Sequence, residues 1–364
     1  MSITDPNSVL ILGAGVSAPF RLPLGGDFID LIATGIESER GRLFSQRDPF
    51  SNDLRQYLHN AAWGYSDFER FPIHGAVCAS LIPKRWQSEN VAEVNAKLDG
   101  LKELAKLLSN QTSETIDDFI VENPRVADLT KKAGAAIMVL RCFDLVDSCI
   151  PKSFETRHVA SSKERNWIHY LINIVRHGVR QGQVSSENKV RIVTFNYDTI
   201  LEYVLDAQFS NTEAAHGDYR QFIEIVHVHG KFDDLADCRH TPAQIAASWA
   251  NGIHVVNEAS PPADVAAARA RAREIVLAAR SIYCAGFSFA GPNCRLIGLD
   301  KQPNASRRIS FCNYDGNVGV LKSAERFKNQ ATFGTEVEET AGTLPNPLSV
   351  SAWFKAGHSG ELPG

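Results

Sequence analysis

The sequence lacks paired cysteines. The number of cysteines is odd, seven, and no two of them have the Cys-x-x-Cys spacing. A structural zinc site of the paired-cysteine type is therefore excluded, and this spacing argues against a disulfide framework in a chain of 364 residues. The cysteines are Cys78, Cys142, Cys149, Cys238, Cys284, Cys294 and Cys312.

Long apolar runs and a strong excess of one charge are also missing. No apolar run approaches the roughly 20 residues that span a bilayer, and residues 1–7 do not have the pattern of an export signal. The 38 Lys and Arg residues against 42 Asp and Glu residues leave a net charge of −4. This balance argues against nucleic-acid binding driven by overall charge. We expect a cytoplasmic protein that binds neither a membrane nor nucleic acid directly.

What is present is an alternation of short apolar runs with helical segments. Apolar runs that are typical of strands cover residues 8–12, 190–195, 222–228, 281–285 and 308–312. An Ala- and Arg-rich segment with helical character covers residues 264–280. Strands that alternate with helices predict a parallel sheet covered on both faces. We therefore expect an α/β fold with a Rossmann-like parallel sheet covered by helices.

A large insertion interrupts this pattern after the first strand. Strand-like runs are scarce in it, and helical spacing recurs over residues 91–108, 133–149 and 166–179. The last residues are rich in Gly, Pro and Ser, which is typical of a loose or interface-forming tail. The predicted organisation is a Rossmann domain (1–26 plus 189–340), a mainly helical insertion or small domain (27–188) and a tail (341–364).

The first predicted strand ends at a glycine-rich turn, Gly13-Ala14-Gly15-Val16-Ser17-Ala18. The turn fits the G-x-G-x-x-G/A pattern, in which Gly15 would let backbone N–H groups approach a pyrophosphate. A plain strand-to-helix turn explains it as well. No acidic strand end follows within about 20 residues, which disfavours a hydride-transferring dehydrogenase. The G-x-x-x-x-G-K-S/T pattern is absent, which excludes a P-loop NTPase.

The other predicted strands end in polar or glycine-rich residues too. These are Asn196-Tyr197-Asp198, His229-Gly230, Gly286-Phe287-Ser288 and Asn313-Tyr314-Asp315. Because the carboxyl ends of parallel strands line one crevice, we expect these residues to converge there. Helix capping is the alternative for Asn196 and Asp198, and turn chemistry is the alternative for the last two groups. His229 has the better position for a general base, because His227 would lie deeper in the sheet.

Together these residues resemble the Sir2 (sirtuin) superfamily. Three features separate the chain from the protein deacylases of that family. It cannot form their four-cysteine zinc module, and Leu24-Gly25-Gly26 replaces their Asp-Phe-Arg. Tyr197 stands where deacylases usually carry Ile. In these respects it resembles the bacterial Sir2-like NAD-hydrolysing effectors of anti-phage defence. The matching residues are Gly13-Ala14-Gly15-Val16-Ser17, Leu22-Pro23, Thr194-Phe195-Asn196-Tyr197-Asp198, His229-Gly230, Gly286-Phe287-Ser288, Asn293 and Asn313.

The resemblance implies an NAD+ glycohydrolase, with NAD+ as its substrate and no metal. Asn196 would orient the nicotinamide ribose and the attacking water, and His229 would take a proton. Asp198 would orient these two residues or bind the ribose. The residues implied to hold NAD+ are Gly13, Ala14, Gly15, Ser17, Pro23, Gly286, Ser288, Asn313 and Asp315.

The resemblance also implies control of this activity by assembly. We expect a homo-oligomer, or a separate activating partner such as a HerA-type ATPase or a short Argonaute. Two other functions stay open at this point. One is an NAD-dependent protein deacylase, against which the missing zinc module argues. The other is a non-catalytic scaffold that binds NAD or ADP-ribose and regulates a partner.

Overall fold

The chain divides into two compact units in a computed structural model. The first unit comprises residues 1–20, 156–231 and 256–364, and the second comprises residues 21–155 and 232–255. The structure describes residues 3–20, 22–23, 28–33, 91–110, 116–145, 167–210, 217–232, 248–256, 260–301, 307–312, 318–330, 335–339 and 353.

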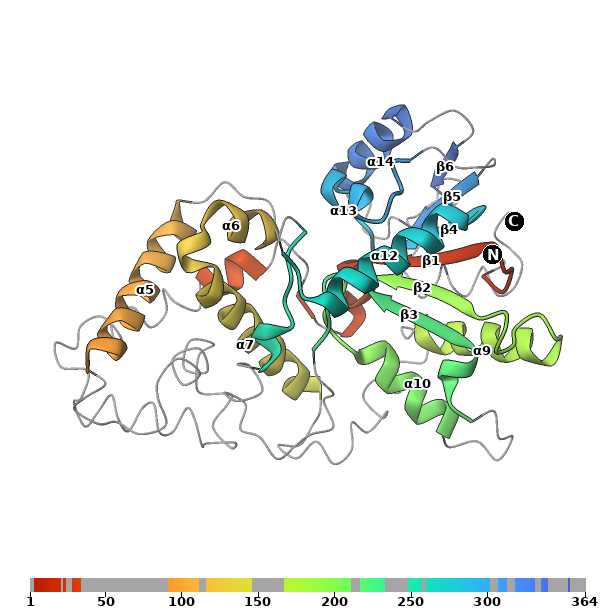
Figure 1. Cartoon of the computed structure of the whole chain (residues 1–364), viewed down its shortest axis with the longest axis horizontal. Helices are drawn as coiled ribbons and strands as arrows, with labels where there is room; N and C mark the ends of the chain where they lie inside the picture. Colours follow the sequence, from red (N-terminus) through yellow and green to blue (C-terminus); the bar gives the residue numbers. More distant parts are fainter. Residues whose placement is uncertain are drawn as a thin grey trace. The chain divides into compact units, whose positions relative to one another are not determined.

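The first unit is built on a six-stranded parallel sheet with the order β3-β2-β1-β4-β5-β6 (Figure 1). In its centre, Leu10 of β1 lies opposite Ile192 of β2 on one side and Tyr283 of β4 on the other. The topological switch point, where open α/β sheets bind ligands, therefore lies between β1 and β4. The strands are β1 (Ser8–Leu12), β2 (Val190–Thr194), β3 (Ile223–His227), β4 (Ser281–Ala285), β5 (Arg307–Cys312) and β6 (Thr335–Glu339).

Helices connect these strands and cover the sheet. In Figure 1, α12 crosses one face of the sheet. Helix α10 packs against α9, where Arg176 donates a hydrogen bond to the carbonyl of Gln208 at 2.8 Å. The elements of this unit are α9 (Trp167–Arg180), α10 (Ile200–Ser210), α12 (Ala263–Ala278), α13 (Gly291–Leu296), α14 (Val318–Gln330) and the 3-10 turns η1 (Ala14–Val16), η2 (Ala18–Phe20) and η6 (Tyr219–Gln221).

The central strand is buried on both faces, as its apolar run predicts. Side chains alternate along a strand. Val9 and Ile11 accordingly belong to a core cluster with Ile275 of α12, whereas Leu12 shares a pocket lining with Trp167 of α9. Helices thus cover both faces of the sheet, and the predicted α/β class with a Rossmann-like parallel sheet is confirmed.

The described elements of the second unit are helical. Helix α5 packs against α7, and Leu101 and Leu104 of α5 are fully buried. The segment after residue 231 adds a stacked aromatic pair, in which the ring centroids of Phe232 and Trp249 lie 4.4 Å apart. The elements are α5 (Val91–Ser109), α6 (Ile116–Glu122), the 3-10 turn η5 (Pro124–Val126) and α7 (Ala127–Leu145).

Helix α9 belongs to the first unit, although our sequence prediction placed its residues in the insertion at 27–188. Its apolar face is buried, with Ile168 and Leu171 at 0% exposure. Its Trp167 indole donates a hydrogen bond to the carbonyl of Val16, 2.9 Å away in the turn after β1. Residues 232–255 group instead with the second unit. The division by contacts therefore differs from the predicted boundaries at both places.

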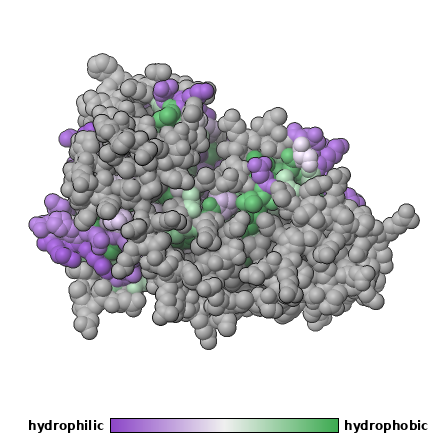
Figure 2. All heavy atoms as spheres, turned by 180° about the vertical axis from the view of Figure 1, so that it is seen from behind, coloured by the Kyte–Doolittle hydropathy of each residue, from purple (hydrophilic) through white to green (hydrophobic). Residues whose placement is uncertain are grey.

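Figure 2 shows one face of the molecule, on which small areas of hydrophobic residues and larger areas of hydrophilic residues both reach the surface. Val121, at 43% exposure, is the large apolar side chain that is exposed among the described residues. Within the same ranges, every helix is too short or too polar to span a membrane.

Candidate functional site

The turn after β1 and the turn after β4 pack closely against each other, and glycines occupy the positions of contact. A Cβ atom on Gly13 would lie 2.3 Å from the carbonyl oxygen of Gly286, and one on Gly15 would lie 2.7 Å from its Cα. Gly286 has a φ of +61°, and a Cβ there would lie 2.4 Å from the backbone nitrogen of Val16. Side chains cannot be accommodated at these distances. The glycines therefore allow two backbone turns to touch at the switch point.

The backbone amides of the first turn are largely occupied. Gly13 donates to the carbonyl of Ala285 at 3.0 Å, and Gly15 donates to that of Gly286 at 3.2 Å. The amides of Val16 and Ser17 donate to carbonyls within the same turn. A pyrophosphate would have to displace some of these bonds or bind through other groups. The binding of NAD+ by Gly13, Ala14, Gly15 and Ser17 stays a prediction.

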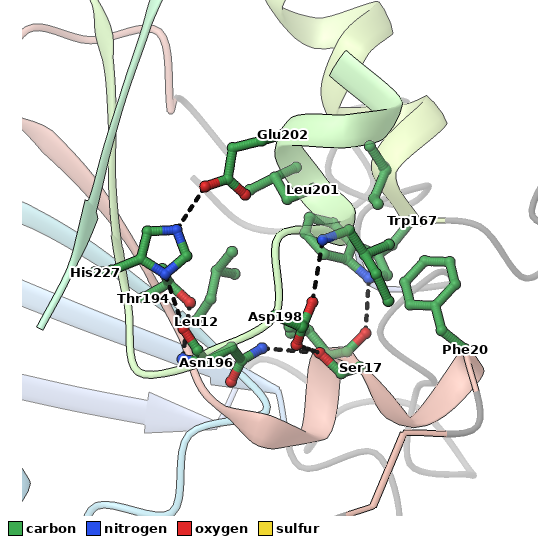
Figure 3. A pocket seen from close by; sticks show the side chains of 13 residues that line it. Leu12, Ser17, Phe20, Trp167, Thr194, Asn196, Asp198, Leu201, Glu202 and His227 are labelled. Atoms are coloured by element: carbon green, nitrogen blue, oxygen red, sulfur yellow. Dashed lines mark hydrogen bonds and ion pairs between the residues drawn. The ribbon is translucent and has the colours of Figure 1, made fainter. Parts of the chain in front are cut away.

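Ser17, Asn196 and Asp198 form a hydrogen-bonded cluster (Figure 3). The side-chain nitrogen Nδ2 of Asn196 donates to the Ser17 hydroxyl at 2.9 Å, and this hydroxyl donates to Asp198 Oδ2 at 2.9 Å. The other oxygen of Asp198 accepts the backbone N–H of Ile200 at 3.3 Å, at the first residue of α10. The structure thus brings together residues from the ends of β1 and β2. Asp198 also has the helix-capping contact that was its alternative explanation.

His227 and Glu202 extend this cluster. His227 is the last residue of β3 and pairs in register with Thr194 of β2. Its Nδ1 lies 2.8 Å from the backbone carbonyl of Asn196, and its Nε2 lies 2.6 Å from Glu202 Oε1 in the first turn of α10. Both side chains are nearly buried, at 8% and 14% exposure. A buried hydrogen-bonded pair of titratable side chains therefore holds the loop between β2 and α10.

Burial and pairing shift the pKa values of these groups. Burial raises the pKa of Asp198, although hydrogen bonds from Ser17 and Ile200 act in the opposite direction. Burial disfavours the charged forms of Glu202 and His227 as well. Their mutual hydrogen bond and opposite charges outweigh it, so the pKa of Glu202 is lowered and that of His227 is raised. Each partner therefore favours the charged form of the other, and Asp198 takes up a proton more readily than an exposed aspartate does.

A small pocket, partly open to solvent, lies beside this network. The free space inside it is about 20 Å³, which is room for one or two water molecules. The lining side chains must therefore move before a larger ligand can enter the pocket. Its polar lining residues are Ser17, Thr194, Asn196, Asp198, Glu202 and His227, and its apolar ones are Leu12, Val16, Phe20, Trp167, Ile168, Ile200 and Leu201.

His229 is not among the residues that line this pocket. Its ring packs against Phe195, with the centroids 5.3 Å apart, and against Tyr197 at 5.9 Å. Asn196, the residue between these two aromatics, directs its amide to Ser17 instead. The side chain of His229 is buried, at 3% exposure. Its role as a general base stays a prediction.

The remaining predicted NAD-binding residues fall in different places. Gly286 contacts the first turn, and Ser288, two residues later, is exposed. Pro23 is buried and belongs to the second unit. Asn313 and Asp315 lie outside the described residues.

His227 and Glu202 are site residues that were not predicted from the sequence. The predicted strand placed His227 deeper in the sheet than His229, but β3 ends at His227, which brings that ring level with the loop after β2. A signal for Glu202 was available, because a residue four positions after the capping Asp198 lies in the first helical turn on the same side. Trp167 carried no such signal, since its partner Val16 is 151 positions away in the sequence.

No group of three or more His, Cys, Asp or Glu side chains is suitably placed for a metal ion in the part of the chain that the structure describes. Neither the protein-family models nor the curated proteins with which the chain was compared match it.

Proposed function

We propose that this protein is an NAD+ glycohydrolase, which converts NAD+ and water into nicotinamide and ADP-ribose. The observation that carries the proposal is the cluster of Ser17, Asn196 and Asp198, which lies where β1 and β2 end. The strand order of the sheet is the one that binds dinucleotides beside its switch point. The resemblance to Sir2-like NAD hydrolases assigns NAD+ contacts to the same residues.

The chemistry requires orientation more than a strong nucleophile. The bond between ribose and its leaving group breaks through an oxocarbenium-like state, which a positioned water molecule then attacks. Asn196 Oδ1 is buried and has no hydrogen-bond partner in the described structure. A buried acceptor without a donor costs about 1–3 kcal/mol. A ribose hydroxyl or the attacking water would remove this penalty, so we assign Asn196 to hold one of them.

The attacking water must lose a proton when its oxygen bonds to the ribose carbon. His227 is unsuited to take it, because both of its ring nitrogens are already engaged. His229 keeps this role in the proposal, a step worth about 10²–10⁴-fold in rate. Its 3% exposure means that Tyr197 or the neighbouring loop has to move when NAD+ binds. Nicotinamide leaves as a neutral molecule.

We also propose, from the resemblance, that the protein depletes NAD+ in bacterial anti-phage defence. An uncontrolled activity of this kind would kill the host cell. We therefore propose that the activity is controlled by homo-oligomerisation or by a separate partner, for which the resemblance implies a HerA-type ATPase or a short Argonaute.

The test measures nicotinamide release from NAD+ by the purified full chain, over a range of protein concentrations. Asn196→Ala and His229→Ala should each lower the rate by about 10²-fold or more while the protein stays folded. Asp206→Asn is the matched control, because Asp206 lies on α10 in an ion pair with Arg220 that is about half exposed. Undiminished turnover in either site variant would contradict the assigned roles.

The same assay separates the alternative functions. Strict dependence of NAD+ consumption on an acylated peptide would indicate a protein deacylase. Binding of NAD+ without turnover at every protein concentration would indicate a regulatory scaffold. Either result would overturn the proposed hydrolase.

A further inference from the structure

His227 is held at both of its ring nitrogens. Nδ1 contacts the carbonyl oxygen of Asn196 at 2.8 Å, and Nε2 contacts Glu202 Oε1 at 2.6 Å. A carbonyl oxygen only accepts hydrogen bonds, so Nδ1 must carry a proton. The contact between Nε2 and the carboxyl group needs a second proton between them. The geometry therefore requires a doubly protonated ring beside a carboxylate, or a singly protonated ring beside a carboxylic acid.

The first of these two forms is favoured by the charges around the pair. Lys231 after β3 favours the ionised form of Glu202, and Asp198 favours the protonated form of His227. Tyr219, which also feels the charge of Glu202, titrates far above neutral pH because it is buried. Glu202 Oε2 is buried without a hydrogen-bond partner in the described part of the chain. Its negative charge thus depends mainly on the proton that His227 supplies.

This pair fixes the backbone of Asn196. The backbone N–H of Asn196 donates to Thr194 Oγ1 at 3.1 Å, and its side-chain nitrogen Nδ2 donates to the Ser17 hydroxyl at 2.9 Å. The third point of attachment is its carbonyl, which accepts the proton of His227 Nδ1. Loss of either ring proton would set a nitrogen lone pair against an acceptor oxygen, either the carboxylate of Glu202 across 2.6 Å or the carbonyl of Asn196 across 2.8 Å. In both tautomers the repulsion would displace the ring and release the carbonyl of Asn196.

We propose that His227 and Glu202 are positioning residues, which hold Asn196 in its reactive place only while the ring of His227 carries both protons. This inference rests on the proposed function and adds a pH-sensitive control to it. The control acts through the backbone of Asn196, and neither His227 nor Glu202 exchanges a proton with the substrate.

Glu202→Gln tests whether the second proton of the His227 ring is needed, because it keeps the contact at Nε2 without requiring that proton. A glutamine amide can donate to Nε2 while Nδ1–H still donates to Asn196, so both contacts survive with a neutral ring. The variant should therefore lose the dependence on the second proton. Glu202→Ala removes the partner altogether, and it should lower kcat by about 10²-fold with a smaller change in KM, as expected for a misplaced reactive group.

The first experiment records the ring nitrogens of histidine by NMR in the ¹⁵N-labelled full chain. The signals that disappear in His227→Gln identify His227 among the 11 histidines. Both nitrogens of the wild-type ring should be protonated at pH 7, and only Nδ1 should be protonated in Glu202→Gln. Asp206→Asn, on the same helix, should leave the His227 signals unchanged. A singly protonated wild-type ring at pH 6, or an unchanged titration in Glu202→Gln, would contradict the inference.

The second experiment measures kcat for NAD+ cleavage between pH 5 and 10. The wild-type kcat should fall at alkaline pH as His227 loses its second proton, and this fall should be absent in Glu202→Gln. An identical alkaline fall in both proteins would overturn the positioning role. Absence of NAD+ cleavage at every pH would overturn the proposed function instead, and the NMR result would still decide whether the pair shares the proton.

Discussion

Gly286 combines two requirements that only glycine meets. Its φ of +61° lies in the left-handed region, and the space around its Cα is filled by the backbone of Gly15 and Val16. These contacts set how closely the turn after β4 approaches the turn after β1. Of the glycines at the switch point, Gly286 is the one that needs both a positive φ and the absence of a side chain.

Gly286→Ala tests this requirement. A residue with a Cβ in the left-handed region costs roughly 1–2 kcal/mol. Gly182→Ala is the matched control, because Gly182 has a φ of +69° but nothing within 4 Å of the added carbon. We expect Gly286→Ala to lower the free energy of unfolding by roughly 1–3 kcal/mol more than Gly182→Ala does, because it also crowds the core. Equal losses in urea titrations of the two variants would show that the close approach contributes nothing.

The cluster at Asn196 was partly predictable from the sequence. Polar residues that follow parallel strands lie at one edge of the sheet, so the meeting of Ser17, Asn196 and Asp198 follows from the strand pattern. The choice between His227 and His229 did not follow. It depends on the residue at which β3 ends, and the apolar pattern allows strand ends to shift by a few residues.

The position of helix α9 could not be predicted from the sequence either, although the helix itself could. Its strongly amphipathic sequence predicts a helix with one buried face. Amphipathicity does not say which surface that face covers, so the helix was placed with its neighbours in sequence. Strand β6 (TEVEE) was missed for a different reason. Its charged residues suit an edge strand at the end of the sheet, but they do not form an apolar run.

The Trp167 indole ties α9 to the turn that begins the candidate site. Trp167→Phe keeps most of the ring and leaves the buried carbonyl of Val16 without its donor. We expect a loss of about 1–3 kcal/mol in the free energy of unfolding. Tyr170→Phe, on the same helix and partly exposed, removes one hydroxyl and should change stability by less than about 0.5 kcal/mol. Equal effects of the two variants on urea unfolding would contradict the importance of this bond.

The contact between His227 of β3 and Glu202 of α10 should make the free energy of unfolding depend on pH. The folded pKa of His227 is raised, so its contribution is complete below pH 6.5 and is lost as the pH rises through the folded pKa. The folded pKa of Glu202 is lowered, so its contribution is complete above pH 4.5 and is lost as the pH falls through the folded pKa. The pair therefore stabilises the fold fully between these two values.

Denaturation across this range checks the prediction. The difference in free energy of unfolding between the wild type and His227→Gln should be largest from pH 4.5 to 6.5, the ordinary pKa values of the two groups, and should decline on both sides. Glu224→Gln is a control, because Glu224 pairs with Arg271 in a partly exposed contact on the same strand. A pH-independent difference for His227→Gln would contradict the buried ion pair.

The first unit, which contains the sheet, carries every described residue of the candidate site except Pro23. The unit that contains Pro23 supplies helices but none of the residues that line the pocket. We expect that unit and the tail at residues 341–364 to serve assembly, as the resemblance implies. NAD+ turnover that rises more than linearly with protein concentration would be consistent with this expectation.

Hydrolysis of NAD+ by this protein can be tested directly by following the oxygen atom of the attacking water. The full chain is incubated with NAD+ in H₂¹⁸O, without any acylated peptide, and the products are analysed promptly by mass spectrometry. Hydrolysis of NAD+ should give unlabelled nicotinamide and ADP-ribose that carries one ¹⁸O atom, and Asn196→Ala should form both products more slowly, by about 10²-fold or more. ADP-ribose without the label, equal product from Asn196→Ala, or no cleavage at any protein concentration would contradict the proposed hydrolysis.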